Sequence, residues 1–141
     1  MADPIRFPVL PRTTRQLMSG LSTPAAGMSV QQRFLDVISR NLANVETTRT
    51  ADGGPYQRQV VTVNGDVAEG TGAASEVTDP RAGRRLYDPG HPDADADGFV
   101  TYPNVDVNTE LVDLMVARRV FEANATVFQA AKSMLRRALE I

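Results

Sequence analysis

NTELVDLMVARRVFEANATVFQAAKSMLRRALE, residues 108–140, decides the fold that we expect for this chain. The segment contains neither proline nor glycine. Asn108 or Asp106 can cap its start, and Glu110 would complement the helix dipole in the first turn. A helix over these residues would be roughly 50 Å long, at about 1.5 Å per residue. That length is too great for an ordinary domain of 141 residues.

Apolar residues form two stripes on this predicted helix. The first stripe contains Val107, Leu111, Leu114, Arg118, Phe121, Ala125, Phe128, Lys132, Leu135 and Leu139. The second stripe contains Val112, Met115, Val116, Ala123, Val127, Ala130, Met134, Ala138 and Ile141. One apolar stripe is enough for packing against one partner helix, so two adjacent stripes require partners on more than one side. We expect the N-terminal helix to cover one stripe and other subunits to cover the other. The alternative is one wide stripe beneath the central part of the chain, which is poor in large apolar residues.

Residues 13–45 form the other predicted helical segment. Thr13 and Gln16 offer a capping box, while Thr23 and Pro24 offer a second helix start. Whether one helix bends at Pro24 or two short helices meet there stays open. Beyond this point apolar residues recur with heptad-like spacing at Met28, Leu35, Ile38, Leu42 and Val45.

The central part of the chain, residues 46–104, is rich in Gly, Pro, Asp and Thr. Its apolar residues alternate, which is typical of strands. We predict short strands within residues 56–63, 84–88 and 98–102, and a loop over residues 64–83.

The expected fold is mainly α, with long N- and C-terminal helices packed as a coiled-coil-like pair and a small β-rich insertion between them. Its predicted parts are a disordered N-terminal arm (residues 1–12), a helical segment (13–45), the insertion (46–104) and the long C-terminal helix (105–141). The arm is predicted because its prolines prevent a helix and little of it can be buried.

Composition excludes several classes of partner. The formal charge of −2 predicts no general attraction to nucleic acid. No apolar run approaches the ~18 residues needed to span a membrane, so we expect no direct membrane insertion. Prolines interrupt the apolar residues at the N-terminus, which therefore does not resemble a cleaved secretory signal. The chain contains no cysteine, which excludes disulfides and thiolate metal sites.

The acidic stretch HPDADADG, residues 91–98, begins like a calcium-binding loop. Asp93, Asp95, Asp97 and the following glycine match the first half of that motif. Its closing position is Asn104, which cannot supply the two anionic oxygens of the usual Glu. We therefore predict a turn whose Asp side chains bond nearby backbone N–H groups, and no metal site. A calcium-dependent adaptor is the rival hypothesis.

No catalytic constellation is present in the sequence. There is no cysteine, and the single histidine, His91, has no nucleophile motif with it. The glycine-rich phosphate-binding motifs are absent as well. We expect the protein to be no enzyme and to bind no cofactor.

The helical segment of the N-terminal half ends in SRNLANVETTRT, residues 39–50. Asn41 and Asn44 are poor helix formers, so propensity does not explain their presence in the last turns. Their side chains could form hydrogen bonds that fix how the chain leaves the helix. The alternative is a fraying helix end with an Asn C-cap.

GMSVQQRFLDVISRNLANVETTRT, residues 27–50, resembles the N-terminal motif of the flagellar axial proteins, which form the rod, hook and hook–filament junction. The motif centres on Asn41, Leu42, Ala43 and Asn44. GGPYQRQVV (53–61), YDPGHPDADADGFVTYPNVDV (87–107) and RVFEANATVFQAAKSMLRRALEI (119–141) resemble rod members of the same family. The similarity covers residues 27–63 and 84–141.

The resemblance implies a structural subunit of the proximal rod of the bacterial flagellar basal body. Such subunits assemble into a helical tube that transmits torque and surrounds the export channel. The implied partners are other proximal and distal rod proteins, the basal-body adaptor, copies of the same chain and the flagellar type III export apparatus. The implied location is the periplasmic rod, reached without a cleaved signal peptide.

In such an assembly, apolar seams of both helices would interlock with neighbouring subunits. The residues expected at these contacts are Met28, Leu35, Ile38, Leu42, Val45, Leu111, Leu114, Phe121, Phe128, Leu135 and Leu139.

Overall fold

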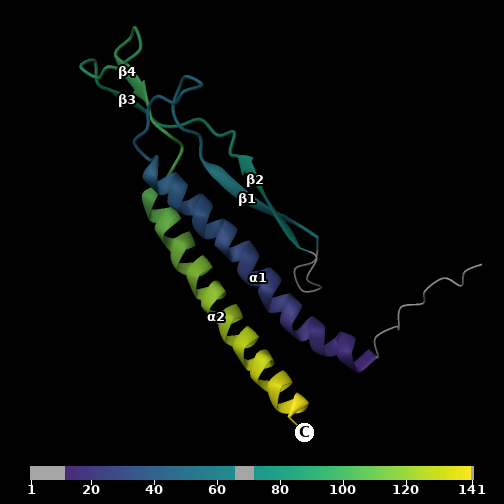
Figure 1. The fold of residues 1–141 in the computed structure, drawn as a ribbon. Coiled ribbons are helices and arrows are strands. Elements are labelled where there is room, and N and C mark those ends of the chain that lie inside the picture. Colours follow the sequence, from purple (N-terminus) through teal and green to yellow (C-terminus); the bar gives the residue numbers. More distant parts are fainter. Residues whose placement is uncertain (1–11, 66–71, 141) are drawn as a thin grey trace, which may run out of the picture.

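The computed structural model describes residues 12–65 and 72–140 (Figure 1). In chain order the elements are α1 (Arg12–Ala43), β1 (Gln59–Asn64), β2 (Ala73–Thr78), β3 (Arg85–Tyr87), β4 (Phe99–Thr101) and α2 (Val107–Leu139). The predicted fold class, mainly α with a small β insertion between two long helices, is confirmed. The arm predicted for residues 1–12 lies outside the described residues, apart from Arg12, where α1 begins.

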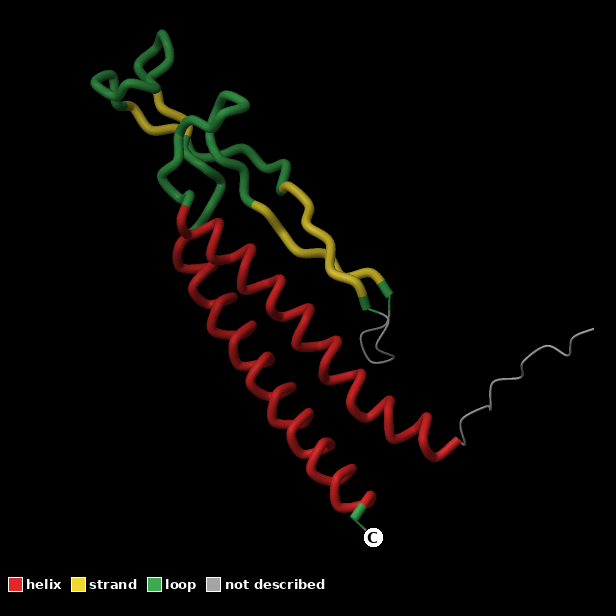
Figure 2. The backbone as a smooth tube through the Cα atoms, in the orientation of Figure 1, coloured by secondary structure: helices red, strands yellow, loops and turns green. Residues whose placement is uncertain are grey.

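The two helices lie side by side and run in opposite directions (Figure 2). α1 continues through Pro24 as one helix, which answers the question that the sequence left open. Val30, Val37 and Ile38 of α1 form the buried core together with Ala117 of α2. Asp106 caps α2, because its carboxylate accepts a hydrogen bond from the backbone N–H of Asn108 (3.0 Å).

The insertion consists of two small antiparallel sheets, β1–β2 and β3–β4. In the first sheet Gln59 lies opposite Thr78 and Asn64 lies opposite Ala73. The loop predicted for residues 64–83 is therefore wrong where β2 forms. Most side chains of β2 are exposed, so its sequence lacks the apolar alternation that identifies a half-buried strand.

The second sheet lies beyond the end of the helix pair (Figure 1). Val100 on β4 is fully buried, and the rings of Tyr87 and Phe99 meet edge to face with 5.2 Å between their centroids. Before β3 the chain passes close to the end of β4, where a side chain at Gly83 would collide with the backbone oxygen of Tyr102. This close approach requires glycine.

The β1–β2 hairpin packs on α1 and not on α2 (Figure 1). The second apolar stripe of α2 is consequently open to solvent, and Met115 (71%) and Met134 (66%) are among its most exposed members. The alternative of one wide stripe beneath the insertion is therefore wrong for the described part of the chain. This face of α2 is an apolar surface that the described part of the chain leaves uncovered.

Candidate functional site

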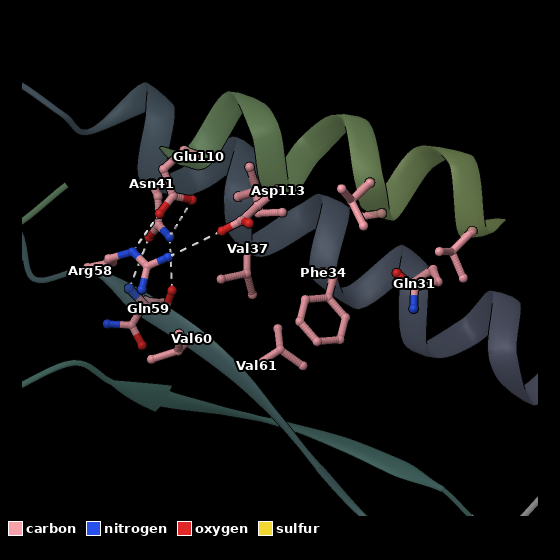
Figure 3. Close-up of a pocket in the computed structure, with 14 residues that line it drawn as sticks. Gln31, Phe34, Val37, Asn41, Arg58, Gln59, Val60, Val61, Glu110 and Asp113 are labelled. Carbon is pink, nitrogen blue, oxygen red and sulfur yellow. Dashed lines mark hydrogen bonds and ion pairs between the residues drawn. The ribbon is translucent and has the colours of Figure 1, made fainter. Parts of the chain in front are cut away.

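Asn41, near the end of α1, lies at the centre of a group of polar residues (Figure 3). Only 1% of its surface is exposed. Its Oδ1 accepts hydrogen bonds from the backbone N–H of Gln59 (2.9 Å) and from the hydroxyl of Tyr56 (2.9 Å). Its Nδ2 donates to the backbone oxygen of Gln59 (2.9 Å) and to Oε2 of Glu110 (3.2 Å). A side-chain amide has two donors and two acceptor sites, so Asn41 uses its full capacity.

Arg58 is the cation of this group. Its Nε donates to Oε1 of Glu110 (2.5 Å), and its Nη atoms lie 3.7 Å from carboxylate oxygens of Asp79 and Asp113. Glu110 is fully buried in the first turn of α2, where a negative charge also complements the helix dipole. Removing either partner of such a buried pair leaves an uncompensated charge, so the pair strongly favours this one arrangement of α2 and β1.

Asn104, just before α2, connects the insertion to the same group. Its Oδ1 accepts from the backbone N–H of Arg58 (2.8 Å), and its Nδ2 donates to the backbone oxygen of Asp79 (3.3 Å). The Asp79 carboxylate accepts hydrogen bonds from the side chain and from the backbone N–H of Arg81. These bonds, of which that of the side chain has the larger effect, lower the pKa of Asp79 from its ordinary value of 3.8 to about 2. We call Asn41, Tyr56, Arg58, Asp79, Asn104 and Glu110 the polar cluster.

Asn44 caps the end of α1. Its Nδ2 donates to the backbone oxygen of Arg40 (2.8 Å), and its Oδ1 accepts from the hydroxyl of Thr47 (3.2 Å). Both asparagines thus form side-chain hydrogen bonds where the chain leaves the helix, and Asn44 is also the capping residue of the alternative interpretation. Between them Leu42 is half-buried and Ala43 is exposed.

Ion pairs on the surface attach β2 to α1. The carboxylate of Glu76 accepts from Nη2 of Arg40 (2.6 Å) and from Nη1 of Arg33 (3.2 Å), and the Arg40 contact lowers the pKa of Glu76. Exposed pairs contribute little to stability because solvent screens them. These pairs therefore orient the hairpin, while the polar cluster anchors it.

A groove of about 300 Å³ lies between α2, α1 and β1 (Figure 3). Phe34 of α1 and Val61 of β1 point toward one another in it. Val116 and Val120 of α2 also line the groove. The polar cluster closes one end of the groove.

The acidic stretch forms a turn, as predicted. Oδ1 of Asp95 accepts from the backbone N–H groups of Phe99 (2.9 Å) and Asp97 (3.0 Å). Both bonds lower the pKa of Asp95, and the bond from Phe99 has the larger effect. Asp93 pairs with Arg49 (2.7 Å) and accepts from the hydroxyl of Thr48 (2.7 Å). Within residues 12–65 and 72–140, His, Asp and Glu side chains form no group of three that could hold a metal ion.

The residues predicted for contacts between subunits lie in three environments. Ile38 is buried inside the chain, whereas Leu111 and Leu139 are exposed. The remaining members are half-buried: Met28, Leu35, Leu42, Val45, Leu114, Phe121, Phe128 and Leu135. None of the helices in the described part of the chain is long and apolar enough to cross a membrane.

Of the polar cluster, only Asn41 is predicted from the sequence to form side-chain hydrogen bonds. The first-turn position of Glu110 predicts an interaction with the helix dipole alone, and Arg58 lies in a segment whose pattern predicts a strand. The partners of Asn41 lie 15, 18 and 69 positions away in the sequence. No local pattern reports such pairings.

Comparisons with known proteins identify relatives over nearly the whole chain. Residues 96–141 match a family model described as flagellar basal body rod FlgEFG protein C-terminal. The flagellar basal-body rod protein FlgC of Borreliella burgdorferi is 37% identical, over 89% of this chain and 97% of the relative. The proteins of the same name from Bacillus subtilis (86% of this chain, 95% of the relative) and Salmonella typhimurium (89% and 97%) are each 35% identical.

Proposed function

The chain belongs to the family of flagellar basal-body rod proteins, and we propose that it is a structural subunit of the proximal rod, a helical tube that transmits torque and surrounds the export channel. The observation that carries this proposal is the second stripe of α2, an apolar face that runs the length of the helix and stays uncovered in the single chain. A contiguous exposed apolar face of this kind marks an interaction surface. The relatives are named as rod proteins, and a passive structural role suits the chain better than catalysis.

In the rod, the second stripe would meet the helices of neighbouring subunits. Its described members are Val112, Met115, Val116, Ala123, Val127, Ala130, Met134 and Ala138, all of them exposed. A head-to-tail contact that does not close on itself generates a helical tube rather than a ring. Of the contact residues predicted from the sequence, the exposed Leu111 and Leu139 remain candidates for direct contact, whereas the half-buried residues would support the stripe from behind.

The proposed partners are copies of this chain, other proximal and distal rod proteins and the basal-body adaptor. The proposed location is the periplasmic part of the basal body. The flagellar type III apparatus is the proposed route of export.

The direct test is mass spectrometry of detergent-resistant basal bodies purified from the source cells, compared with the soluble fraction of the same cells. We expect this chain to be enriched in the basal bodies together with the other rod proteins. A chain found only in the soluble fraction of flagellated cells would refute the rod assignment.

Val127→Asp tests the second stripe directly. Val127 is 55% exposed, so the substitution should leave the stability of the isolated chain nearly unchanged, yet it buries a charge when subunits associate. We expect normal expression, no incorporation into basal bodies and no motility. Ser133→Asp, on the polar face of the same helix, is the matched control and should remain motile. Phe121 is a poorer probe because it is half-buried in the single chain, so its replacement would also disturb the fold.

A further inference from the structure

The β3–β4 sheet has one closed edge and one open edge. At the outer edge of β4, the backbone oxygen of Phe99 accepts from the N–H of Asp95 (2.8 Å), and its N–H donates to Oδ1 of Asp95 (2.9 Å). The acidic turn therefore takes the place of a third strand on this side. β3 forms the other edge, and it packs on no helix or strand other than β4 in the described part of the chain (Figure 1).

Arg85 and Tyr87 present their backbone groups at the open edge. The backbone groups of Arg84 and Asp88, on either side of them, bond to the β4 side of the sheet. Because backbone groups alternate between the two edges of a strand, Arg85 and Tyr87 direct their N–H and C=O away from β4. These groups bond to no other described residue. Leu86 is 53% exposed and Tyr87 63% exposed, so the side chains leave this edge accessible.

We propose that this edge pairs with the same edge of a second copy of the chain, in antiparallel orientation and with Leu86 at the two-fold axis. The contact would join two sheets of two strands into one sheet of four. Two-stranded sheets are marginally stable alone, whereas three or more strands with an apolar face can be stable. The inference goes beyond the proposed function, because a two-fold contact closes at two copies and does not extend a helical tube.

The sequence of the edge, Arg-Arg-Leu-Tyr-Asp, is complementary to itself in this arrangement. Arg84 would lie opposite Asp88 of the second copy at both ends of the pairing. Arg85 would lie opposite Tyr87, whose ring can receive a guanidinium group, and the two copies of Leu86 would meet at the centre. Opposite charges and apolar pairs directly across a sheet stabilise it. Neither Arg84 nor Asp88 has an ion-pair partner among the described residues, so both are available.

Other registers lose this match. The hydrogen-bonding pattern allows shifts by two residues only. A shift in one direction places Arg85 opposite Arg85 of the second copy, and like charges in that position are destabilising. A shift in the other direction places Arg85 opposite Pro89, which has no N–H to donate. The two arginines would also discourage pairing with unrelated apolar strands, so the edge favours its own copy.

The first test is disulfide trapping, which suits a weak dimer of short strands and a chain without cysteine. Leu86→Cys would place two thiols at a non-hydrogen-bonded pair, where Cα atoms are about 4.5 Å apart and a disulfide can form. Tyr87→Cys is the matched control, since its two copies would lie about 9 Å apart, beyond the limit of about 7 Å. Both full-length variants also carry Val127→Asp, which removes association through the second stripe. We expect Leu86→Cys to form the linked dimer at least about tenfold faster.

The second test exchanges charges and needs no cysteine. Arg84→Asp and Asp88→Arg, each alone, would set like charges opposite one another at both ends of the pairing. We expect each variant, again with Val127→Asp, to associate at least about tenfold more weakly than Val127→Asp alone in analytical ultracentrifugation. An equimolar mixture of the two restores opposite charges at both ends and should associate about as well as Val127→Asp alone.

Either of two results would overturn the proposal. One is equal rates of cross-linking by Leu86→Cys and Tyr87→Cys, which would indicate random collision. The other is a mixture of the two charge variants that associates no better than each variant alone. The rod assignment does not depend on these results, because the fractionation of basal bodies tests it separately.

Discussion

Replacing Asn41 by alanine should cost the chain more stability than any other single truncation of a polar side chain in α1. The substitution removes all four hydrogen bonds of the amide in a position that is 1% exposed. It leaves the N–H and C=O of Gln59 without the partner that they have in the wild type. At about 1 kcal/mol for each bond, we expect the free energy of unfolding to fall by about 4 kcal/mol. That is a large share of the stability of a small protein.

The measurement is urea denaturation of the purified chain, followed by circular dichroism at 222 nm. Asn44→Ala is the matched control, because it removes the same side chain three residues later, just after the last residue of α1. The Asn44 amide donates to Arg40 and accepts from Thr47 at a less buried position, so we expect a loss of about 1 kcal/mol.

The reasoning fails if the two Asn variants lose the same amount. Equal losses would mean that Asn41 acts only as a helix cap and that the bonds to Gln59, Tyr56 and Glu110 add nothing. Asn41→Asp gives a second check. The variant keeps an acceptor oxygen, but it replaces the N–H donor to Glu110 with a carboxylate oxygen, so two negative charges would face one another. We expect it to be at least as unstable as the alanine variant at pH 7.

Three other perturbations test the surroundings of the polar cluster. Arg58→Ala leaves the carboxylate of Glu110 buried without its cation and should cost about 3–5 kcal/mol in urea denaturation, and adding Glu110→Gln to it should recover part of that loss. The pKa of Asp79 is about 2 in the folded chain, below its ordinary 3.8, so its stabilising contribution is complete above pH 3.8 and is lost as the pH falls toward 2. The difference in unfolding free energy between the wild type and Asp79→Asn should therefore shrink over that window, and a constant difference would contradict the assignment. Gly83→Ala should lower the melting temperature because its Cβ collides with backbone, whereas Gly20→Ala, which meets no atom in α1, should raise it.

The helices and most strands could be predicted because their signals are local. The periodicity of residues 108–140 and the capping residue Asp106 depend only on neighbours along the chain. Pro24 shows the limit of this reasoning. Proline is favoured at a helix start and disfavoured inside a helix, so the sequence supported two short helices as well as one. Packing decides the outcome, since Pro24 is buried within a single α1.

The polar cluster could not be predicted because it depends on the register between distant segments. Asn41 reaches Glu110 only after α2 has packed against α1 with one alignment, and that alignment is a property of the whole fold. Propensity did indicate that the asparagines needed an explanation beyond helix formation. It did not name the partners, and the charge of Arg58 within a strand-like stretch gave no sign that it would be buried.

The division between polar and apolar contacts explains how one chain can be both definite in shape and able to assemble. Hydrogen bonds are directional, and those between distant segments gather at the end of the helix pair that carries Asn41 and Glu110, where they fix the insertion against both helices. Farther along, the described part of α2 has no buried residue beyond Ala117, and its second stripe offers an apolar surface whose contacts are non-directional. An apolar stripe tolerates small changes in the angle at which a neighbour packs, which subunits of a helical tube under torque require.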